Sequence, residues 1–270
     1  MPDSPRRFAP TISRFSGFAQ DYDRYRPGPP EALAALLAQF MGNARPALMV
    51  DLGSGTGLSS RYWAARAGRV VGVEPSADMR AEALRQTRAA NVEYREGYAH
   101  ATGLPDRCAQ LITCMQALHW MDPQASFVEA RRILVPGGVF AAIDYDWPPV
   151  TPSWRADQAW RSCNERATRL EALLPGERPP RWDKAGHPAR MEASGCFGFV
   201  RDLVLHHVDE GDGDRFLGLL RSQGSVMDLL KAGHGEDELG LSELESITRA
   251  ELGGELRPWF WSARLRIGVV

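Results

Sequence analysis

The residues best suited to chemistry lie in a glycine-rich stretch bounded by two carboxylates, Asp51 and Glu74. Glycines stand at positions 53, 55 and 57, closely following the first of these acids. A turn without Cβ atoms can pass close to a ligand, and its backbone N–H groups point at that ligand from the start of a helix. The stretch therefore predicts a binding site for a nucleotide-like molecule.

Two common glycine signatures do not match this stretch. The dinucleotide pattern Gly-x-Gly-x-x-Gly fails because its third glycine would fall on Leu58 or Ser60. The Gly-Lys-Ser/Thr ending of phosphate-binding loops is missing as well. A carboxylate at Asp51 would repel a pyrophosphate but suits the ammonium and sulfonium groups that S-adenosylmethionine carries. Glu74 is placed to accept hydrogen bonds from two ribose hydroxyls.

A strand, a turn and a helix must position these residues. The apolar run 47–50 leads into Asp51, residues 58–66 are compatible with a helix, and a second apolar run, 70–73, leads into Glu74. This is a βαβ unit, which places both acids at the carboxyl ends of parallel strands. Further strands are expected at 91–95, 111–115, 139–143, 197–208 and 259–269, and further helices at 154–174, 214–231 and 242–252.

The stretch resembles motif I and the following acid of class I S-adenosylmethionine-dependent methyltransferases. Residues 116–120, Gln-Ala-Leu-His-Trp, resemble the Gln-Ala-x-His-Trp segment of the trans-aconitate methyltransferase-like small-molecule group, and residues 134–138 carry the family's Leu-x-Pro-Gly-Gly turn. The resemblance covers about residues 15 to 145. It implies an α/β fold: a Rossmann-like, doubly wound, mostly parallel seven-stranded sheet with helices on both faces, a helical cap, and a last strand antiparallel between the fifth and sixth.

The resemblance also implies S-adenosylmethionine as the cofactor. The acid that often binds the adenine amino group is missing after the third strand, so backbone groups of Tyr98 and Ala99 would have to serve. Met79 either touches the adenine or belongs to the core. The expected cofactor-binding residues are Tyr22, Arg26, Asp51, Gly53, Ser54, Gly55, Thr56, Gly57, Glu74, Pro75, Met79, Tyr98, Ala99 and Gln116.

Aromatic residues precede the core at near-helical spacing, from Phe15 to Tyr25. They form either a packing stripe or, by the resemblance, a lid over cofactor and substrate. We expect a flexible tail at residues 1–11 and a single methyltransferase domain at 12–270. Its parts are the lid and first helix at 12–45, the cofactor-binding core at 46–147, and the substrate-side helices and last strands at 148–270.

The implied reaction is in-line methyl transfer to a small molecule, with O-methylation of a carboxylate or hydroxyl expected. N-methylation of a small heterocycle or amine, and a non-catalytic S-adenosylmethionine-binding protein, are the alternatives. His119 is a candidate base or orienting residue, although a His-Trp pair can also be buried structure, and a sulfonium leaving group makes a base optional. The expected substrate-binding residues are Tyr22, His119, Trp120, Tyr145, Trp147 and Arg221.

Composition and motifs argue against several other classes. A net charge of −2 and a pI near 6.3 give no basic field for a polyanion, and residues 116–119 replace the Asn/Asp-Pro-Pro-aromatic motif of nucleic-acid amino-methyltransferases. The four cysteines lack metal-ligand spacing, and no carboxylate cluster like that of metal-dependent catechol-type enzymes can be assembled. We expect a cytoplasmic protein with a small-molecule substrate and no metal, nucleic-acid partner or membrane contact. The sequence leaves the oligomeric state open.

Overall fold

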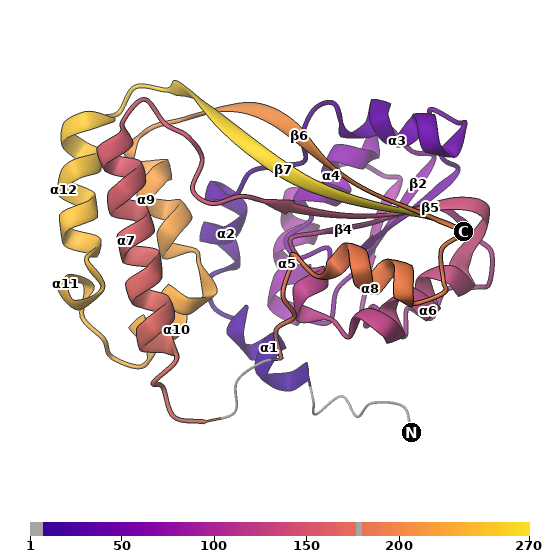
Figure 1. The fold of residues 1–270 in the computed structure, drawn as a ribbon, viewed down its shortest axis with the longest axis horizontal. Helices are drawn as coiled ribbons and strands as arrows, with labels where there is room; N and C mark the ends of the chain where they lie inside the picture. Colours follow the sequence, from indigo (N-terminus) through magenta and orange to yellow (C-terminus); the bar gives the residue numbers. More distant parts are fainter. Residues whose placement is uncertain (1–7, 177–179) are drawn as a thin grey trace.

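One mixed sheet forms the centre of the molecule. The computed structural model describes residues 8–176 and 180–270. The strands of the sheet are β1 (Leu48–Leu52), β2 (Arg69–Val73), β3 (Val92–Arg95), β4 (Ala109–Met115), β5 (Leu134–Tyr145), β6 (Phe199–Gly211) and β7 (Arg257–Val269). Their order is β3-β2-β1-β4-β5-β7-β6 (Figure 1). β1 to β5 pair in parallel, and β7 runs antiparallel between β5 and β6. The predicted Rossmann-like, mostly parallel sheet is confirmed.

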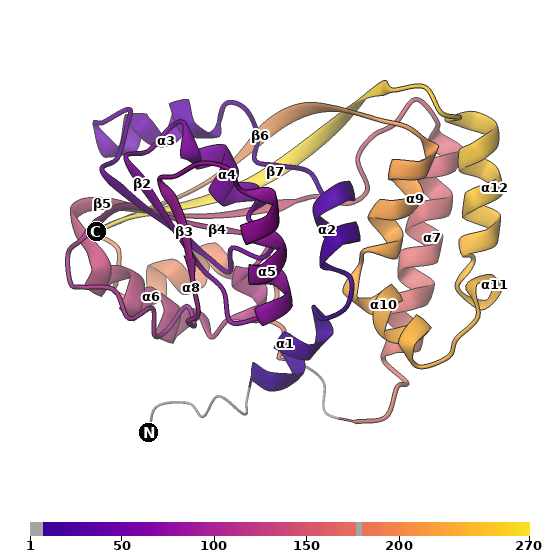
Figure 2. The same ribbon diagram turned by 180° about the vertical axis from the view of Figure 1, so that it is seen from behind.

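Helices cover both faces of the sheet because its central strands are apolar on both sides. On one face Leu33 and Trp63 belong to a large buried cluster, and on the other face Phe127 and Met191 belong to a second cluster. Figure 2 views the sheet from the first of these faces. The helices that pack on the sheet are α3 (Leu33–Met41), α4 (Leu58–Ala64), α5 (Ala77–Gln86), α6 (Pro123–Ile133) and α8 (His187–Ala193).

A second group of helices forms the predicted cap beside the carboxyl ends of the parallel strands (Figures 1 and 2). In this cap α7 (Trp154–Glu171) packs against α10 (Gly224–Lys231), α11 (Glu236–Leu239) and α12 (Leu241–Glu251), and α9 (Gly213–Arg221) packs against α12. The N-terminal helices α1 (Ala9–Arg14) and α2 (Ala19–Tyr25) lie between cap and sheet, since α1 contacts α10 and α2 contacts both α5 and α9. This arrangement encloses a space at the strand tips.

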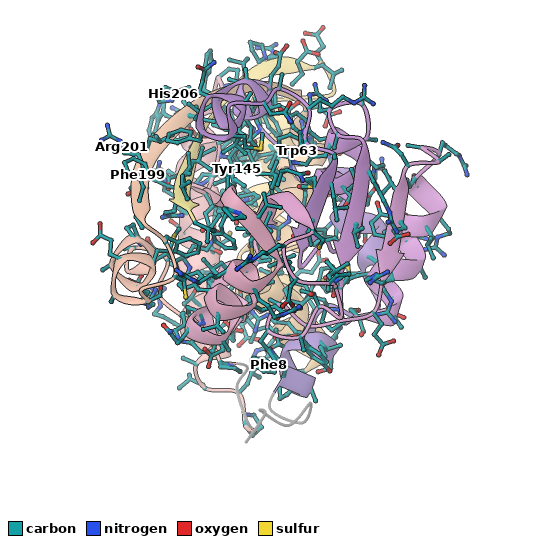
Figure 3. All side chains as sticks on the ribbon, turned by 90° about the vertical axis from the view of Figure 1, so that its right-hand side faces the viewer. Phe8, Trp63, Tyr145, Phe199, Arg201 and His206 are labelled. Atoms are coloured by element: carbon teal, nitrogen blue, oxygen red, sulfur yellow. The ribbon has the colours of Figure 1, made fainter. Side chains whose placement is uncertain are left out.

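The long strands β6 and β7 link the sheet to the cap. Phe199, Arg201 and His206 lie along the outer edge of β6, whereas Trp63 and Tyr145 lie in the interior (Figure 3). No helix among residues 8–176 and 180–270 is long and apolar enough to cross a bilayer.

Three local predictions need correction. The predicted tail is wrong for residues 8–11, because Phe8 is buried and α1 begins at Ala9; residues 1–7 lie outside the described part of the chain. The helix predicted at 214–231 is two helices, α9 and α10, separated at Ser222 and Gln223. Helix α8 was not predicted, since the Pro- and Gly-rich segment before it favours loop.

Candidate functional site

Three adjoining cavities lie at the carboxyl ends of the parallel strands, between the sheet, the N-terminal helices and the cap. The first, of about 110 Å³, lies at the tips of β1, β2 and β4 and is closed by α1. The second, of about 40 Å³, lies over Asp51 and the glycine loop. The third, of about 110 Å³, lies between α1, α7, α10 and the segment before α8. Tyr22 and Gln116 line all three.

The glycine loop exposes its backbone to the first two cavities. Gly53 and Gly55 have left-handed φ angles of 65° and 54°, a conformation that glycine adopts without strain. A Cβ atom on Gly53 would lie 2.6 Å from Cε of Met121, whereas one on Gly55 would meet no protein atom within 4 Å. The space beside Gly55 therefore belongs to the cavities and is available to a ligand.

Glu74 connects the tip of β2 to this loop. Its carboxylate accepts hydrogen bonds from the backbone N–H groups of Gly55, at 3.0 Å, and Ser76, at 2.8 Å. Burial raises the pKa of Glu74, and these two hydrogen bonds oppose that rise. The side chain lines the first cavity, where its remaining lone pairs can accept hydrogen bonds from a ligand.

Asp51 is a buried carboxylate in the wall of the second cavity. It accepts hydrogen bonds from the hydroxyls of Ser60, at 2.7 Å, and Thr113, at 2.9 Å. Burial nevertheless raises the pKa of Asp51 to about 6, because desolvation outweighs these bonds. A ligand cation beside the carboxylate would stabilise its ionised form and offset the cost of desolvation.

Aromatic and apolar groups make up the rest of the first cavity. Met79 is buried in its wall, and the rings of Tyr98 and His100 stack with centroids 5.4 Å apart. Phe8 contacts both rings, at 6.2 and 5.4 Å. Sequence reasoning missed Phe8, Ile12 and His100 as wall residues. Phe8 could have been noticed as the first aromatic residue after a polar start.

The segment predicted as a lid supplies one wall of every cavity. Phe15 meets Trp120 edge-on, at 5.7 Å, and Tyr22 lies beside the guanidinium of Arg26, at 4.8 Å. The same guanidinium contacts Trp147, at 4.7 Å, and donates to the backbone oxygen of Ser222, at 2.7 Å. These contacts hold Arg26 between sheet and cap at the border of the second and third cavities.

The third cavity is basic. Among the described residues no carboxylate lines it, whereas four cationic side chains do, namely Arg14, Arg26, Arg181 and Lys184. Two of these guanidiniums, Arg14 and Arg181, lie 5.1 and 5.3 Å from the ring of Trp120. Arg14 also pairs with Glu171 and Asp228 behind the cavity. Sequence reasoning missed Arg14, Arg181 and Lys184, because only tertiary structure brings their segments together.

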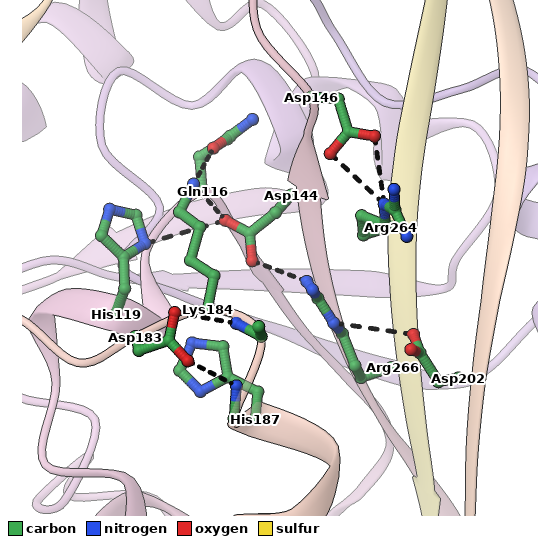
Figure 4. A network of polar contacts seen from close by, with 12 residues as sticks. Gln116, His119, Asp144, Asp146, Asp183, Lys184, His187, Asp202, Arg264 and Arg266 are labelled. Atoms are coloured by element: carbon green, nitrogen blue, oxygen red, sulfur yellow. Dashed lines mark hydrogen bonds and ion pairs between the residues drawn. The ribbon is translucent and has the colours of Figure 1, made fainter. Parts of the chain in front are cut away.

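A buried ion cluster adjoins this cavity, and two of its members, His119 and Lys184, line it (Figure 4). Asp144, at the end of β5, pairs with Arg266 of β7, at 2.9 Å, and with Lys184, at 2.7 Å. His119 Nδ1 lies 3.7 Å from the same carboxylate. Burial lowers the pKa of His119 well below its ordinary value, and the charges of Lys184 and Arg181 lower it further. The imidazole is therefore neutral and weakly basic at neutral pH.

Most of the residues predicted for the site meet at these cavities, but three do not. Tyr145 is buried and donates to the backbone oxygen of Gly28, at 2.7 Å. Arg221 pairs with Glu236 and Glu245 on the cap and lines none of the three cavities. Gly57 faces Tyr94, whose Oη would lie 2.2 Å from an added Cβ. Tyr145, Arg221 and Gly57 therefore contact other parts of the protein and do not line the cavities.

Comparisons with known proteins agree with this geometry. The sequence profile of a methyltransferase domain family matches residues 50–142. A malonyl-[acyl-carrier protein] O-methyltransferase of Enterobacter lignolyticus is 32% identical over 216 residues, which cover 77% of this chain and 84% of that protein. The chain belongs to the class I S-adenosylmethionine-dependent methyltransferases. Its cofactor is S-adenosylmethionine.

Two further matches show how far the likeness to other methyltransferases extends. A solved structure described as a type II methyltransferase from Anaeromyxobacter dehalogenans is 27% identical, with a TM-score of 0.66 and coverage of 91% of this chain and 98% of that one. The chain spans about half the length of the first curated relatives it matches. One of these, an uncharacterized methyltransferase of Mycobacterium tuberculosis, is 36% identical over 118 residues, 43% of this chain and 46% of that protein.

The methyltransferase site fits the chemistry of its cofactor. The carboxylate of Asp51 can pair with a cationic group, and the carboxylate of Glu74 has lone pairs that can accept hydrogen bonds from hydroxyls. Gly55 leaves open space at the border of the first two cavities. No group of His, Cys, Asp and Glu side chains within the described ranges is arranged to hold a metal ion.

Proposed function

We propose that this methyltransferase transfers the methyl group of S-adenosylmethionine to the carboxylate of a small anionic acceptor. The observation that carries the proposal is the basic third cavity, lined by four cationic side chains and, within the part of the chain described, by no carboxylate. Its size of about 110 Å³ suits a small acceptor. The Enterobacter relative, named as a malonyl-[acyl-carrier protein] O-methyltransferase, agrees with transfer to oxygen.

Separate groups of residues bind the two ligands. The first two cavities hold the cofactor, with Glu74 and Met79 at the nucleoside and Asp51 and Arg26 at the charged amino acid end. The third cavity holds the acceptor against Trp120, with Arg181 and Lys184 as its counter-charges. The cofactor supplies an activated methyl group on a sulfonium, so alignment and exclusion of water by the lid supply much of the rate.

His119 favours an acceptor that is already ionised. Its neutral imidazole has a lowered pKa, and a weak base is a poor acceptor for the proton of a phenol or an alcohol. A carboxylate needs no deprotonation at neutral pH. His119 therefore serves as a wall of the third cavity and a neighbour of Asp144 rather than as the base of the reaction.

The test is a screen with S-adenosylmethionine that carries a deuterated methyl group. Small carboxylic acids, phenols and amines are incubated with the protein, and the products are identified by mass spectrometry. We expect methyl esters of carboxylic acids. Arg181→Met should raise KM about ten- to hundred-fold by removing a charged partner, whereas Arg169→Met, an exposed change outside the cavities, should not. Labelled methylamines or methyl ethers, without esters, would contradict the proposal.

Binding of S-adenosylhomocysteine should weaken as the pH falls through about 6. The folded-state pKa of Asp51 is raised to about 6, so below this pH the carboxyl is protonated and cannot pair with the ligand's ammonium group. Affinity should fall up to tenfold per pH unit.

The stability of the free protein depends on pH in the opposite direction. Ionising the buried Asp51 costs folding free energy, so stability decreases as the pH rises from 3.8 to about 6.

Calorimetric titrations from pH 5 to 8 measure this dependence. Asp51→Asn should bind more weakly and should lose most of the pH dependence, whereas Glu74→Gln should keep it. Equal affinities of the wild-type protein at pH 5 and pH 7.5 would show that Asp51 does not meet the ligand cation.

Residues 15–27 should gain protection from hydrogen exchange when S-adenosylhomocysteine binds. Phe15, Tyr22 and Arg26 line the cofactor cavities, so the ligand adds contacts to a segment that contains Gly17 and is followed by Gly28. Exchange followed by mass spectrometry measures the change, and peptides from β7 serve as the control. Equal protection with and without the ligand would identify the segment as a static packing stripe.

A further inference from the structure

Gln116 occupies the junction of the three cavities. It follows β4 and has a φ angle of 54°, which is uncommon for a residue other than glycine and marks a constrained position. Its backbone N–H donates to the backbone oxygen of Ile143, at 2.7 Å, so the sheet holds this conformation. The side chain consequently projects from a rigid strand end toward both ligand sites.

The orientation of the Gln116 amide is determined by a chain of buried charges. Lys184 Nζ lies 3.0 Å from Oε1 of Gln116, and because an ammonium group only donates, the amide oxygen must face it. Lys184 is itself held by Asp144, at 2.7 Å, and Asp144 by Arg266, at 2.9 Å. Figure 4 shows the amide nitrogen on the side away from Lys184.

That amide nitrogen is a donor without an acceptor. Nε2 of Gln116 is buried and has no hydrogen-bond partner among the residues that the structure describes. A buried donor without a partner is costly, and this one lines the cavities, where a ligand can supply the acceptor. The ammonium and carboxylate groups of the cofactor can pair with Asp51 and Arg26 in the second cavity. The Gln116 donor is therefore available to the methyl acceptor.

We propose that Gln116, oriented by Lys184, is the positioning residue that selects an oxygen acceptor over a nitrogen acceptor. This inference rests on the proposed methyl transfer. A carboxylate oxygen can attack with one lone pair while other lone pairs accept the Gln116 hydrogen bond. A neutral amine or heterocyclic nitrogen has one lone pair, which the new N–CH3 bond needs, so the donor has nothing to bind on that atom.

The transfer step balances without another reagent. A lone pair of the carboxylate forms the new O–CH3 bond while the S–CH3 bond breaks and its electron pair returns to sulfur. No proton is released, which agrees with a site that offers a donor at its junction and a weakly basic imidazole nearby.

Nuclear magnetic resonance of the side-chain amide tests this role without turnover. The ¹⁵N-labelled protein is saturated with S-adenosylhomocysteine and titrated with sodium acetate or with methylammonium chloride. The Gln116 side-chain signals are identified by their loss in Gln116→Leu. We expect their protons to move downfield and to saturate with acetate and not with methylammonium. Signals that move on addition of S-adenosylhomocysteine and then ignore acetate would assign the donor to the cofactor and overturn the proposal.

Two variants separate donation from orientation, and acetate binding to them is followed through the indole N–H signal of Trp120, which lines the same cavity. Gln116→Glu keeps the size and the Lys184 contact but removes the donor, so saturable acetate binding should be lost; Gln124→Glu adds the same charge on an exposed surface and should leave it intact. Lys184→Met should weaken the acetate response, because the amide is free to turn. Retained binding of S-adenosylhomocysteine shows that each variant is folded. An unchanged acetate response in Gln116→Glu would overturn the proposal.

Failure of this inference can be told apart from failure of the proposed function. If the labelled-methyl screen yields esters but the Gln116 signals do not move with acetate, the proposed reaction is supported and the proposed role of Gln116 is wrong. If the screen yields methylamines, the selection of oxygen falls together with the proposed acceptor.

Discussion

Replacing Gly55 by valine should abolish binding of S-adenosylhomocysteine while the chain remains folded. A Cβ on Gly55 meets no protein atom within 4 Å, so the larger side chain projects into the cavities proposed for the cofactor. The left-handed φ of 54° adds strain of about 1–2 kcal/mol, which lowers stability without unfolding the protein. Calorimetry should detect no binding at ligand concentrations that saturate the wild-type protein.

A matched variant controls for the strain. Gly137 has a φ of 77° and equally open surroundings, but it lies in β5 far along the strand from the cavities. Gly137→Val should therefore lose similar stability and keep its affinity for S-adenosylhomocysteine. If Gly55→Val binds as well as Gly137→Val, the glycine loop does not contact the cofactor.

Replacing Asp144 by alanine should lower the free energy of unfolding by about 3–5 kcal/mol. The change leaves Arg266, which is almost fully buried, and Lys184 without the carboxylate that pairs with both. A buried charge without its partner is far more costly than an exposed one. Urea denaturation followed by circular dichroism measures the loss.

Asp146 provides the control for this variant. It also pairs with an arginine of β7, Arg264 at 3.0 Å, but both side chains are about half exposed. Solvent screens such a pair, so Asp146→Ala should cost at most about 1 kcal/mol. Similar losses for Asp144→Ala and Asp146→Ala would show that the Asp144 cluster is no more sensitive than a surface pair.

The positions of the residues proposed to bind the cofactor could be predicted from the sequence because these residues follow one local pattern. A buried strand, a glycine turn and a second strand fix where Asp51 and Glu74 must lie, whatever the rest of the chain does. The strand-tip position of Gln116 followed from the same rule.

The residues proposed to bind the acceptor could not be predicted in the same way, because they come from distant segments. Arg14, Arg181 and Lys184 meet only when α1 and the segment before α8 close over the strand tips. Arginines are abundant on surfaces, so no local pattern separates Arg181, in the third cavity, from Arg221, which pairs on the cap. Tyr145 was misplaced for a related reason: its backbone ends β5 at the right edge, but its hydroxyl turns to Gly28.

A structure of the protein with bound S-adenosylhomocysteine tests the central claim most directly. We predict the ribose at Glu74, the amino group at Asp51 and the sulfur beside Gln116 and Tyr22, with the basic third cavity left open for the acceptor. S-adenosylhomocysteine in the third cavity, or with its amino acid end away from Asp51, would contradict the division of the site into cofactor and acceptor cavities.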